Sequence, residues 1–191
     1  MDNEADFPLV VLGLGSNLGD SRIIVMDAIK ALTSVLTELR AASLYETEPL
    51  HVTDQASFIN TAVAGFYPEP LAQGLTQGVS TGGEPQPLWA SAEGSAGKLL
   101  RQINEIEAGF GRDRSRERHW GERTLDIDIL LFGSLILKES GLEIPHPRLK
   151  ERRFALEPLL ELLPEAKEPG TGVLYRSVCD SLPAQEVRKL P

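Results

Sequence analysis

Two aspartates with one residue between them, Asp126 and Asp128, lie in an apolar run from Thr124 to Phe132. The run is rich in isoleucine and leucine, so it predicts a β-strand. Residues i and i+2 of a strand point to the same side, so both carboxylates are expected on one face, with Cα atoms roughly 6–7 Å apart. The apolar side chains expected on the other face are those of Leu125, Ile127, Ile129 and Leu131.

Two unpaired carboxylates on a half-buried strand repel each other and resist the loss of their water. A divalent cation, or a pair of them, would relieve both costs, whereas the plainer interpretation is a solvated edge strand without a site. Five arginines within residues 112–123 favour a site for metal and phosphate, because a guanidinium group stays charged and offers a planar fork of donors. In the same segment, the indole of Trp120 could stack on a base. The alternative for this segment is a solvated charged loop.

A third segment, from Ile144 to Phe154, holds His146 between two prolines. Prolines stiffen the backbone, so this histidine is held in an extended stretch from which it could donate a hydrogen bond to a phosphate. Arg152 and Arg153 add positive charge, and Phe154 adds a flat ring. A lone histidine in a loop more often has no specific role, and that alternative stays open.

The glycines at positions 13, 15 and 19 do not match a nucleotide-binding loop. The dinucleotide fingerprint needs a glycine at position 18, where this chain has leucine, and no Gly-x-x-x-x-Gly-Lys-Ser/Thr string is present. We therefore interpret these glycines mainly as a sharp turn between a strand and a helix, with a loop that faces substrate as the alternative.

The chain has 191 residues, 41% of them hydrophobic, which fits one domain spanning residues 1–191. Its net charge of −9 speaks against non-specific binding to nucleic acid or to an anionic membrane. No apolar run reaches the roughly 18 residues of a membrane span, and the acidic first residues are unlike a signal peptide. The single cysteine, Cys179, cannot form an internal disulfide, so we expect a cytoplasmic protein.

Hydrophobic periodicity predicts the elements that position these residues. Strands are expected at residues 9–14, 43–45, 58–66 and 124–132. Helices are expected from about residue 21, with an apolar face that continues to Leu39, from residue 98, and at 154–163. This order predicts an α+β fold, a ferredoxin-like two-layer sandwich with a mainly antiparallel sheet and helices on one face. Residues 65–97 carry seven glycines and four prolines, and a flexible insertion is predicted at about 80–97.

Taken together, the motifs of this chain resemble those of the 6-hydroxymethyl-7,8-dihydropterin pyrophosphokinase family of folate biosynthesis. The similarity runs from Leu9 to about Pro164. The matching motifs are Gly13–Leu18, Tyr45–Leu50, Phe58–Asn60, Ile106–Glu107, Gly111–Arg112, Trp120–Ile129 and Ile144–Pro147. The most specific part is the string Arg-Thr-Leu-Asp-Ile-Asp, followed at this distance by Pro-His-Pro.

The resemblance implies a reaction and a set of site residues. The family transfers pyrophosphate from ATP to the hydroxymethyl group of 6-hydroxymethyl-7,8-dihydropterin and releases AMP, with two Mg²⁺ ions held by the positions of Asp126 and Asp128. The implied catalytic residues are Arg112, Arg123, Asp126 and Asp128. The implied pterin-binding residues are Thr47, Glu48, Leu50, Phe58, Asn60 and Phe154. The implied ATP-binding residues are Glu107, Arg112, Arg114, Trp120, Arg123, Ile129, His146 and Arg152.

Two other classes of function remain open from the sequence. A different Mg²⁺-dependent enzyme of phosphate esters, such as a nucleotidyltransferase or a nuclease, could also use a carboxylate pair on a strand. A catalytically silent binding module could keep the same fold. On the main interpretation the partners are small molecules, ATP and the pterin, with no nucleic acid and no membrane, and the protein is expected to act as a monomer.

Overall fold

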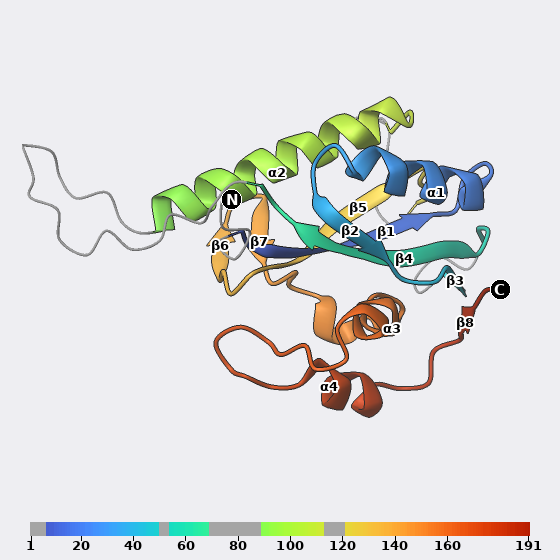
Figure 1. Cartoon of the computed structure of the whole chain (residues 1–191). Helices are drawn as coiled ribbons and strands as arrows, with labels where there is room; N and C mark the ends of the chain where they lie inside the picture. Colours follow the sequence, from blue (N-terminus) through green and yellow to red (C-terminus); the bar gives the residue numbers. More distant parts are fainter. Residues whose placement is uncertain (1–6, 50–53, 69–88, 113–120) are drawn as a thin grey trace, which may run out of the picture.

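The computed structural model describes residues 7–49, 54–68, 89–112 and 121–191 (Figure 1). The first half of the described chain contains β1 (Leu9–Ser16), α1 (Ser21–Leu32), β2 (Thr37–Ala41), β3 (Tyr45–Thr47) and β4 (Phe58–Phe66). The second half contains α2 (Trp89–Gly109), β5 (Asp126–Phe132), β6 (Leu137–Glu139), β7 (Leu142–Ile144), the 3-10 turn η2 (Leu149–Glu151), α3 (Arg153–Leu162), α4 (Tyr175–Ser181) and β8 (Val187–Lys189).

The main sheet runs in the order β5-β1-β4-β3-β8, and β2 also pairs with β4. Every pairing given for its strands is antiparallel. β1 and β2 are joined by α1 and lie on either side of β4, while β5 follows α2 and lies on the far side of β1. This arrangement is the split βαβ pattern of a ferredoxin-like sheet, so the predicted α+β class is confirmed. β6 and β7 form a separate two-stranded sheet.

Helices cover both faces of the main sheet (Figure 1). α1 and α2 lie on one face, as expected, over a core that includes Leu12, Leu32 and Leu99. α3 and α4 lie on the opposite face, a layer that the sequence analysis did not include. The sheet needs this layer because β1 also presents Val11 to that side, where it packs in one cluster with Leu156 of α3.

An irregularity in the pairing of β1 with β5 changes the direction of one predicted side chain. Val11 pairs with Leu131, but the next residue, Leu12, pairs with Ile129, so Leu130 is an additional residue in β5. Leu131 therefore belongs to the cluster on the α3 side, not to the face of Ile129 where the sequence pattern placed it. The two aspartates precede the irregularity, so they keep the alternation that the pattern predicts.

α1 is shorter than its apolar spacing predicts. Asp20 caps its start, because the Asp20 carboxylate accepts a hydrogen bond from the backbone N–H of Ile23 at 3.2 Å. Its end follows Leu32, where the hydroxyls of Thr33 and Ser34 donate to backbone carbonyls of the last turn at 2.7 and 2.8 Å. Leu39 consequently lies in β2 and packs against the core from the sheet.

α2 begins nine residues earlier than residue 98, where the sequence pattern placed it, at Trp89. Residues 80–88 of the predicted insertion lie outside the described part, whereas residues 89–97 are helical, so a loop is the wrong prediction for them. The sequence there contains Ala90, Ala92, Glu93 and Ala96, which are strong helix formers and outweigh the two glycines at 94 and 97. Within the described residues, no helix has both the length and the apolar character that crossing a membrane requires.

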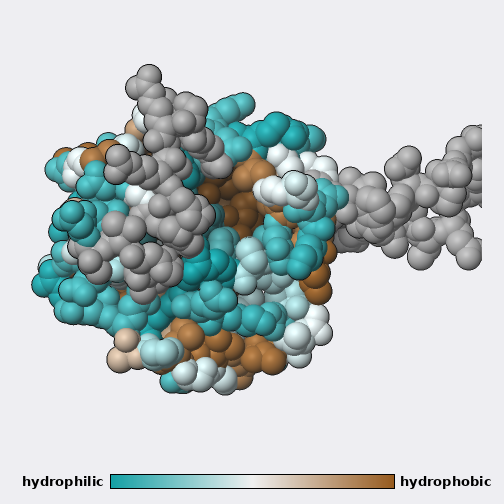
Figure 2. All heavy atoms as spheres, turned by 180° about the vertical axis from the view of Figure 1, so that it is seen from behind, coloured by the Kyte–Doolittle hydropathy of each residue, from teal (hydrophilic) through white to brown (hydrophobic). Residues whose placement is uncertain are grey.

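The surface is mostly hydrophilic in the view of Figure 2, with a hollowed apolar area near the middle of that face. A hollow lined by apolar side chains, with a few polar groups that set specificity, is typical of a pocket that binds a small molecule.

Candidate active site

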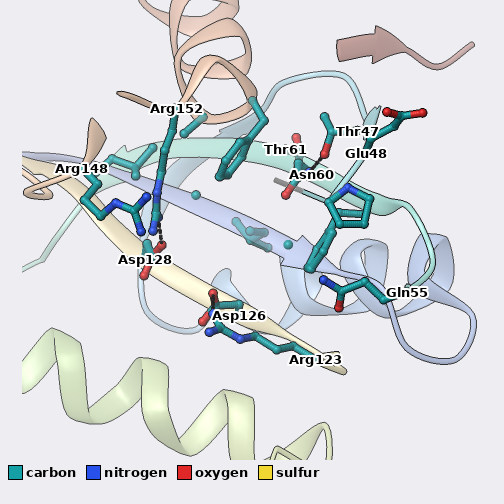
Figure 3. A pocket seen from close by; sticks show the side chains of 18 of the residues that line it. Thr47, Glu48, Gln55, Asn60, Thr61, Arg123, Asp126, Asp128, Arg148 and Arg152 are labelled. Atoms are coloured by element: carbon teal, nitrogen blue, oxygen red, sulfur yellow. Dashed lines mark hydrogen bonds and ion pairs between the residues drawn. The ribbon is translucent and has the colours of Figure 1, made fainter. Parts of the chain in front are cut away.

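One pocket brings together most of the described residues that the sequence analysis selected (Figure 3). It lies where β5, β1 and β4 run side by side, on the face of the sheet that carries α3. Residues of the β3–β4 loop, the two arginines that flank η2 and the start of α3 complete its wall. The pocket lining contains Gly13, Gly15, Thr47, Glu48, Gln55, Phe58, Asn60, Arg123, Asp126, Asp128, Arg148, Arg152 and Phe154.

Gly13 and Gly15 form the floor between the two functional walls of the pocket. Gly13 pairs with Asp128 on one side, and Gly15 pairs with Asp126 on that side and with Asn60 on the other. A Cβ at Gly15 would come within 2.9 Å of the Asn60 side-chain oxygen, so the missing side chain keeps this floor open. The sequence pattern predicted a turn at both glycines. This prediction is wrong, because β1 continues through them to Ser16.

Asp126 is held by two arginines, one from each end of the loop between α2 and β5. Both Arg112 and Arg123 pair with its carboxylate. Burial by itself would raise the pKa of Asp126, but the two guanidinium groups outweigh that effect and lower the pKa. The Asp126 carboxylate is therefore ionised at neutral pH.

Asp128 has a weaker set of partners. Its Oδ2 lies 3.1 Å from Arg152 Nη1 and 3.6 Å from His146 Nε2. Burial, and next the neighbouring charge of Asp126, raise the pKa of Asp128 despite these partners. The side chain is 36% exposed, against 22% for Asp126, so of the two carboxylates it is the more open to a ligand in the pocket.

Glu107, a predicted ATP-binding residue, is almost fully buried at the end of α2. Its carboxylate accepts a hydrogen bond from the backbone N–H of Ile127 at 2.8 Å and pairs with Arg112. Arg112 thus lies between Glu107 and Asp126, with its side chain only 7% exposed. In this structure Glu107 orients an arginine of the site and is not part of the pocket wall.

His146 lies beside the pocket with its ring orientation set by the backbone. The backbone N–H of Arg148 donates to His146 Nδ1 at 3.1 Å, which leaves the proton of the neutral ring on Nε2, the nitrogen that faces Asp128. Burial is the main cause that lowers the pKa of His146, so the ring is neutral at pH 7. A neutral ring in this orientation offers an Nε2–H donor toward the carboxylate end of the pocket.

The other wall carries the predicted pterin-binding residues. Thr47, Glu48, Phe58, Asn60 and Phe154 all line the pocket. Asn60 donates to Thr47 Oγ1 across β4 and β3, and the guanidinium carbon of Arg152 lies 5.7 Å from the centre of the Phe154 ring. This wall therefore combines two flat apolar rings with an amide of fixed orientation.

Besides Glu107, Arg112 and His146, which are near the pocket but not part of its lining, four more of the selected residues are absent from the lining for separate reasons. Leu50, Arg114 and Trp120 lie outside the described part of the chain. Ile129 is described, but its side chain is in the core under α1 and α2, on the face of β5 opposite the aspartates. The alternation of a strand requires this, so only its backbone could meet a ligand.

Sequence reasoning missed Asn17 and Gln55. The side-chain oxygen of Asn17 accepts from the backbone N–H of Arg123 at 2.8 Å, and its Nδ2 donates to Gln55 Oε1 at 3.1 Å. Asn17 thus joins the start of the Asp-bearing segment to the β3–β4 loop. The only signal in the sequence was the position of Asn17 inside a motif, because its partners are far away along the chain.

The donor set suits a hard cation that shares its ligands with a substrate. The carboxylates of Asp126 and Asp128 reach the pocket from the same strand, and oxygen ligands are those that Mg²⁺ prefers. Among the described residues, no three His, Cys, Asp or Glu side chains gather into a complete metal site. The aspartates fit Mg²⁺ only if other oxygens, from a phosphate and from water, complete the coordination.

Comparison with known proteins gives relatives over most of the chain. The sequence model of 7,8-dihydro-6-hydroxymethylpterin-pyrophosphokinase (HPPK) matches residues 11–77 and 88–164. A Bacillus subtilis protein named 2-amino-4-hydroxy-6-hydroxymethyldihydropteridine pyrophosphokinase is 33% identical over 166 residues, which cover 86% of this chain and 83% of that protein. A folate synthesis bifunctional protein of Arabidopsis thaliana is 35% identical over 158 residues, covering 82% of this chain but only 27% of the longer protein.

Solved structures support the fold. The wild-type HPPK-DHPS of Plasmodium falciparum, solved with pterin and p-hydroxybenzoate, superposes with a TM-score of 0.60 at 15% identity, covering 94% of this chain and 42% of that one. At this identity the likeness concerns the fold alone. The sequence match over most of the chain is what decides the family: the chain belongs to the 7,8-dihydro-6-hydroxymethylpterin-pyrophosphokinase family.

Proposed function

We propose that the pocket between β5, β1, β4 and α3 is the active site in which pyrophosphate passes from ATP to the hydroxymethyl group of 6-hydroxymethyl-7,8-dihydropterin. Family membership makes the chain a pyrophosphokinase of folate biosynthesis, with ATP as co-substrate. Our proposal assigns the contacts with pterin, triphosphate and Mg²⁺ to individual residues of this pocket. Its main support is that one pocket has a wall of carboxylates and arginines facing a wall of aromatic rings and an amide.

The aromatic and amide wall suits a reduced pterin. Pterin is a flat, neutral ring with hydrogen-bonding edges, so rings on both faces and an amide at the edge satisfy its chemistry. We assign the stacking to Phe58 and Phe154 and the edge contact to Asn60. Thr47 fixes the Asn60 amide, and Glu48 lies at the mouth of the same wall, where Leu50 is proposed to follow it.

The charged wall suits the triphosphate. Transfer of a phosphoryl-type group needs positioning and neutralisation of charge more than covalent help from the protein. We assign this work to Arg112, Arg123 and Arg152, with an Nε2–H donor from His146. Arg114, Trp120 and the backbone of Ile129 complete the proposed nucleotide contacts, and Glu107 contributes by orienting Arg112.

We assign two Mg²⁺ ions to Asp126 and Asp128, with phosphate oxygens and water as further ligands. Bound there together with the nucleotide, the ions would neutralise phosphate oxygens that gain charge during the transfer. The pairing of Asp126 with Arg112 and Arg123 sets a condition on this site, because at least one guanidinium must exchange the carboxylate for a phosphate. Tight binding of Mg²⁺ should therefore depend on the nucleotide.

Release of AMP from ATP in the presence of Mg²⁺ and 6-hydroxymethyl-7,8-dihydropterin tests the proposal. Wild-type protein should release AMP only when the pterin is present. Asp128→Asn should stay folded, which circular dichroism can check, and should lose nearly all of this activity, because the amide cannot replace the charge that holds a cation.

Two results would contradict the assignment. An Asp128→Asn rate close to that of the wild type would remove the carboxylate pair from the mechanism. Cleavage of a nucleic acid without pterin, in place of AMP release, would favour the phosphate-ester alternative. Asp180→Asn is a matched control, because Asp180 is an exposed aspartate on α4 and should leave the rate unchanged.

We further propose that the protein acts as a monomer in the cytoplasm. The single cysteine, Cys179, is buried beside α3, and burial raises the pKa of its thiol to about 11, so it is poorly suited to a disulfide between chains. Sedimentation of the purified protein with and without a reducing agent tests this, and a dimer in either condition would contradict it.

A further inference from the structure

Arg148 lines the pocket but is not among the site residues selected from the sequence. It lines the pocket together with Arg152, and Figure 3 draws both side chains reaching toward Asp128 from the segment that leads into α3. Its backbone position is well defined, because its N–H donates to His146 Nδ1 and the next residue, Leu149, is fully buried. The fold therefore fixes the point from which its side chain reaches the pocket.

One contact of Arg148 on the protein is with an exposed carboxylate, which it can exchange at little cost. Arg148 Nε donates to Glu151 Oε2 at 3.2 Å, within the same turn. The Glu151 side chain is 65% exposed, and ion pairs in contact with solvent contribute little to stability. An anion in the pocket could replace Glu151 without loss of a buried interaction.

The charges at the two ends of the carboxylate wall also differ. At the Asp126 end, Arg112 and Arg123 are matched by two protein carboxylates, those of Asp126 and Glu107. At the Asp128 end, Arg148 and Arg152 line the pocket beside Asp128, and the carboxylate of Glu151, which Arg148 contacts, is mostly exposed. Two guanidinium groups from one short segment therefore reach the same end of the pocket, an arrangement that can bind an anionic ligand.

We propose that Arg148 binds the phosphate chain of the nucleotide at the Asp128 end, beside Arg152. The inference rests on the proposed function, because it takes ATP as the anion that enters this pocket. A guanidinium group suits the task, since its fork of donors can bind two oxygens of one phosphate. Arg148 is then a binding residue for the phosphates and has no contact with the pterin.

Calorimetric titration with a non-hydrolysable ATP analogue and Mg²⁺ tests the proposal on Arg148→Gln, Arg148→Lys and the wild type. Loss of a charge-assisted hydrogen bond should weaken the binding of the analogue about tenfold in Arg148→Gln. Arg148→Lys should recover part of the affinity, because the charge remains and the fork is lost. Inorganic tripolyphosphate should show the same loss as the analogue, whereas adenosine and 6-hydroxymethylpterin should bind all variants equally.

Lys150→Gln is the matched control, because it removes a positive charge from the same turn. Lys150 pairs with Glu168 at 2.6 Å and is not part of the pocket, so its variant should bind the analogue within twofold of the wild type. Equal binding of the analogue to Arg148→Gln and the wild type would overturn the inference and leave the proposed function standing. Equal losses for analogue and pterin, with a lowered unfolding midpoint, would also overturn it, since Arg148 would then only support the pocket. A wild type that binds no nucleotide would overturn both.

Discussion

Asn60 donates a hydrogen bond from its side-chain Nδ2 to Oγ1 of Thr47, with 2.7 Å between the two atoms. Both side chains are buried, at 5% and 3% exposure, and they join β4 to β3 at the wall of the pocket. The bond leaves one N–H and the oxygen of the amide to meet other partners. The amide that we assign to the pterin edge is therefore held in one orientation before any ligand arrives.

Thr47→Val should weaken pterin binding while leaving nucleotide binding unchanged. Valine keeps the shape of threonine but removes the acceptor, so the Asn60 amide loses its fixed orientation, at a cost of about 1 kcal/mol and about fivefold in affinity. Titration of 6-hydroxymethylpterin and of an ATP analogue measures the two effects separately. Thr47→Ser keeps the hydroxyl and serves as the control. Equal pterin affinity for Thr47→Val and the wild type would show that this hydrogen bond does not prepare the site.

Gly15→Ala should be more harmful than Gly13→Ala. A Cβ at Gly15 would lie 2.9 Å from Asn60 Oδ1, while one at Gly13 would lie 3.3 Å from methyl groups of Leu130, which can move. We expect a loss of about 2 kcal/mol in the free energy of unfolding for Gly15→Ala and less than half of that for Gly13→Ala. Urea denaturation of the two variants measures the difference. The reverse order of stability would contradict a floor that depends on the size of residue 15.

Asp126→Asn should lower stability and Asp128→Asn should not, although both variants should lose activity. Neutralising Asp126 removes the carboxylate that Arg112 and Arg123 share, and although Arg112, only 7% exposed, keeps its pair with Glu107, the loss should lower the free energy of unfolding by about 2 kcal/mol. Neutralising Asp128 removes a carboxylate whose pKa is raised by burial and by the neighbouring Asp126, so stability should be unchanged or higher. Denaturation of both variants at pH 7 without Mg²⁺ measures the contrast. Equal losses in both variants would mean that the arginines do not distinguish the two carboxylates.

The strand periodicity and the carboxylate pair could be predicted from the sequence because both depend on neighbours along the chain. The alternation of Asp126, Ile127 and Asp128 follows from backbone geometry alone and holds in the structure. The direction of Leu131 depends on the additional residue, Leu130, in the pairing of β5 with β1, and the periodicity of β5 alone does not show where that residue falls. For this reason Leu131 lies on the face opposite to the predicted one, although the strand itself was predicted correctly.

Contacts between distant segments account for most of what the sequence pattern missed in the site. Asn17 meets Arg123 and Gln55, and each pair is separated by more than thirty residues, at 106 and 38 positions. Arg148 and Arg152, on either side of η2, line the same pocket as residues of β1, β4 and β5. Such placements follow from the tertiary packing of several elements, and local periodicity carries no trace of them.

Glu161 should make stability depend on pH in the acid range. Its carboxylate accepts hydrogen bonds from Tyr45 Oη at 2.6 Å and Ser43 Oγ at 2.9 Å, and it pairs with Lys189 at 3.2 Å. Burial would raise the pKa of Glu161, but these partners outweigh it and lower the pKa. A lowered pKa in the folded state gives stability that is present above the pKa of the unfolded state and is lost as the pH falls through the folded value.

Glu161→Gln lacks this contribution, so the difference in unfolding free energy between wild type and variant should shrink as the pH falls from about 5 to about 3. Urea denaturation at a series of pH values measures the difference. Tyr45→Phe removes the shortest hydrogen bond and should reduce the same pH dependence without abolishing it. A difference that stays constant, or grows toward low pH, would contradict the assignment.

Removal of residues 186–191 should weaken pterin binding through the sheet. β8 pairs with β3 so that Val187 is opposite Thr47, and the N–H of Leu190 donates to the carbonyl of Leu44 at 2.8 Å. Loss of this strand exposes the edge of β3 and should lower the free energy of unfolding by about 2 kcal/mol, from a few backbone hydrogen bonds. The looser β3 no longer holds Thr47 against Asn60, so pterin affinity should fall about fivefold while that of an ATP analogue stays within twofold.

The double variant Arg188→Ala with Lys189→Ala separates the backbone ladder from the side-chain charges of β8. Both side chains are mostly exposed, at 67% and 57%, so their ion pairs contribute little, and the double variant should bind pterin like the wild type. Titration of pterin against the truncated protein and the double variant makes the comparison. If the double variant loses as much affinity as the truncation, the effect comes from charge and not from the strand pairing that holds Thr47.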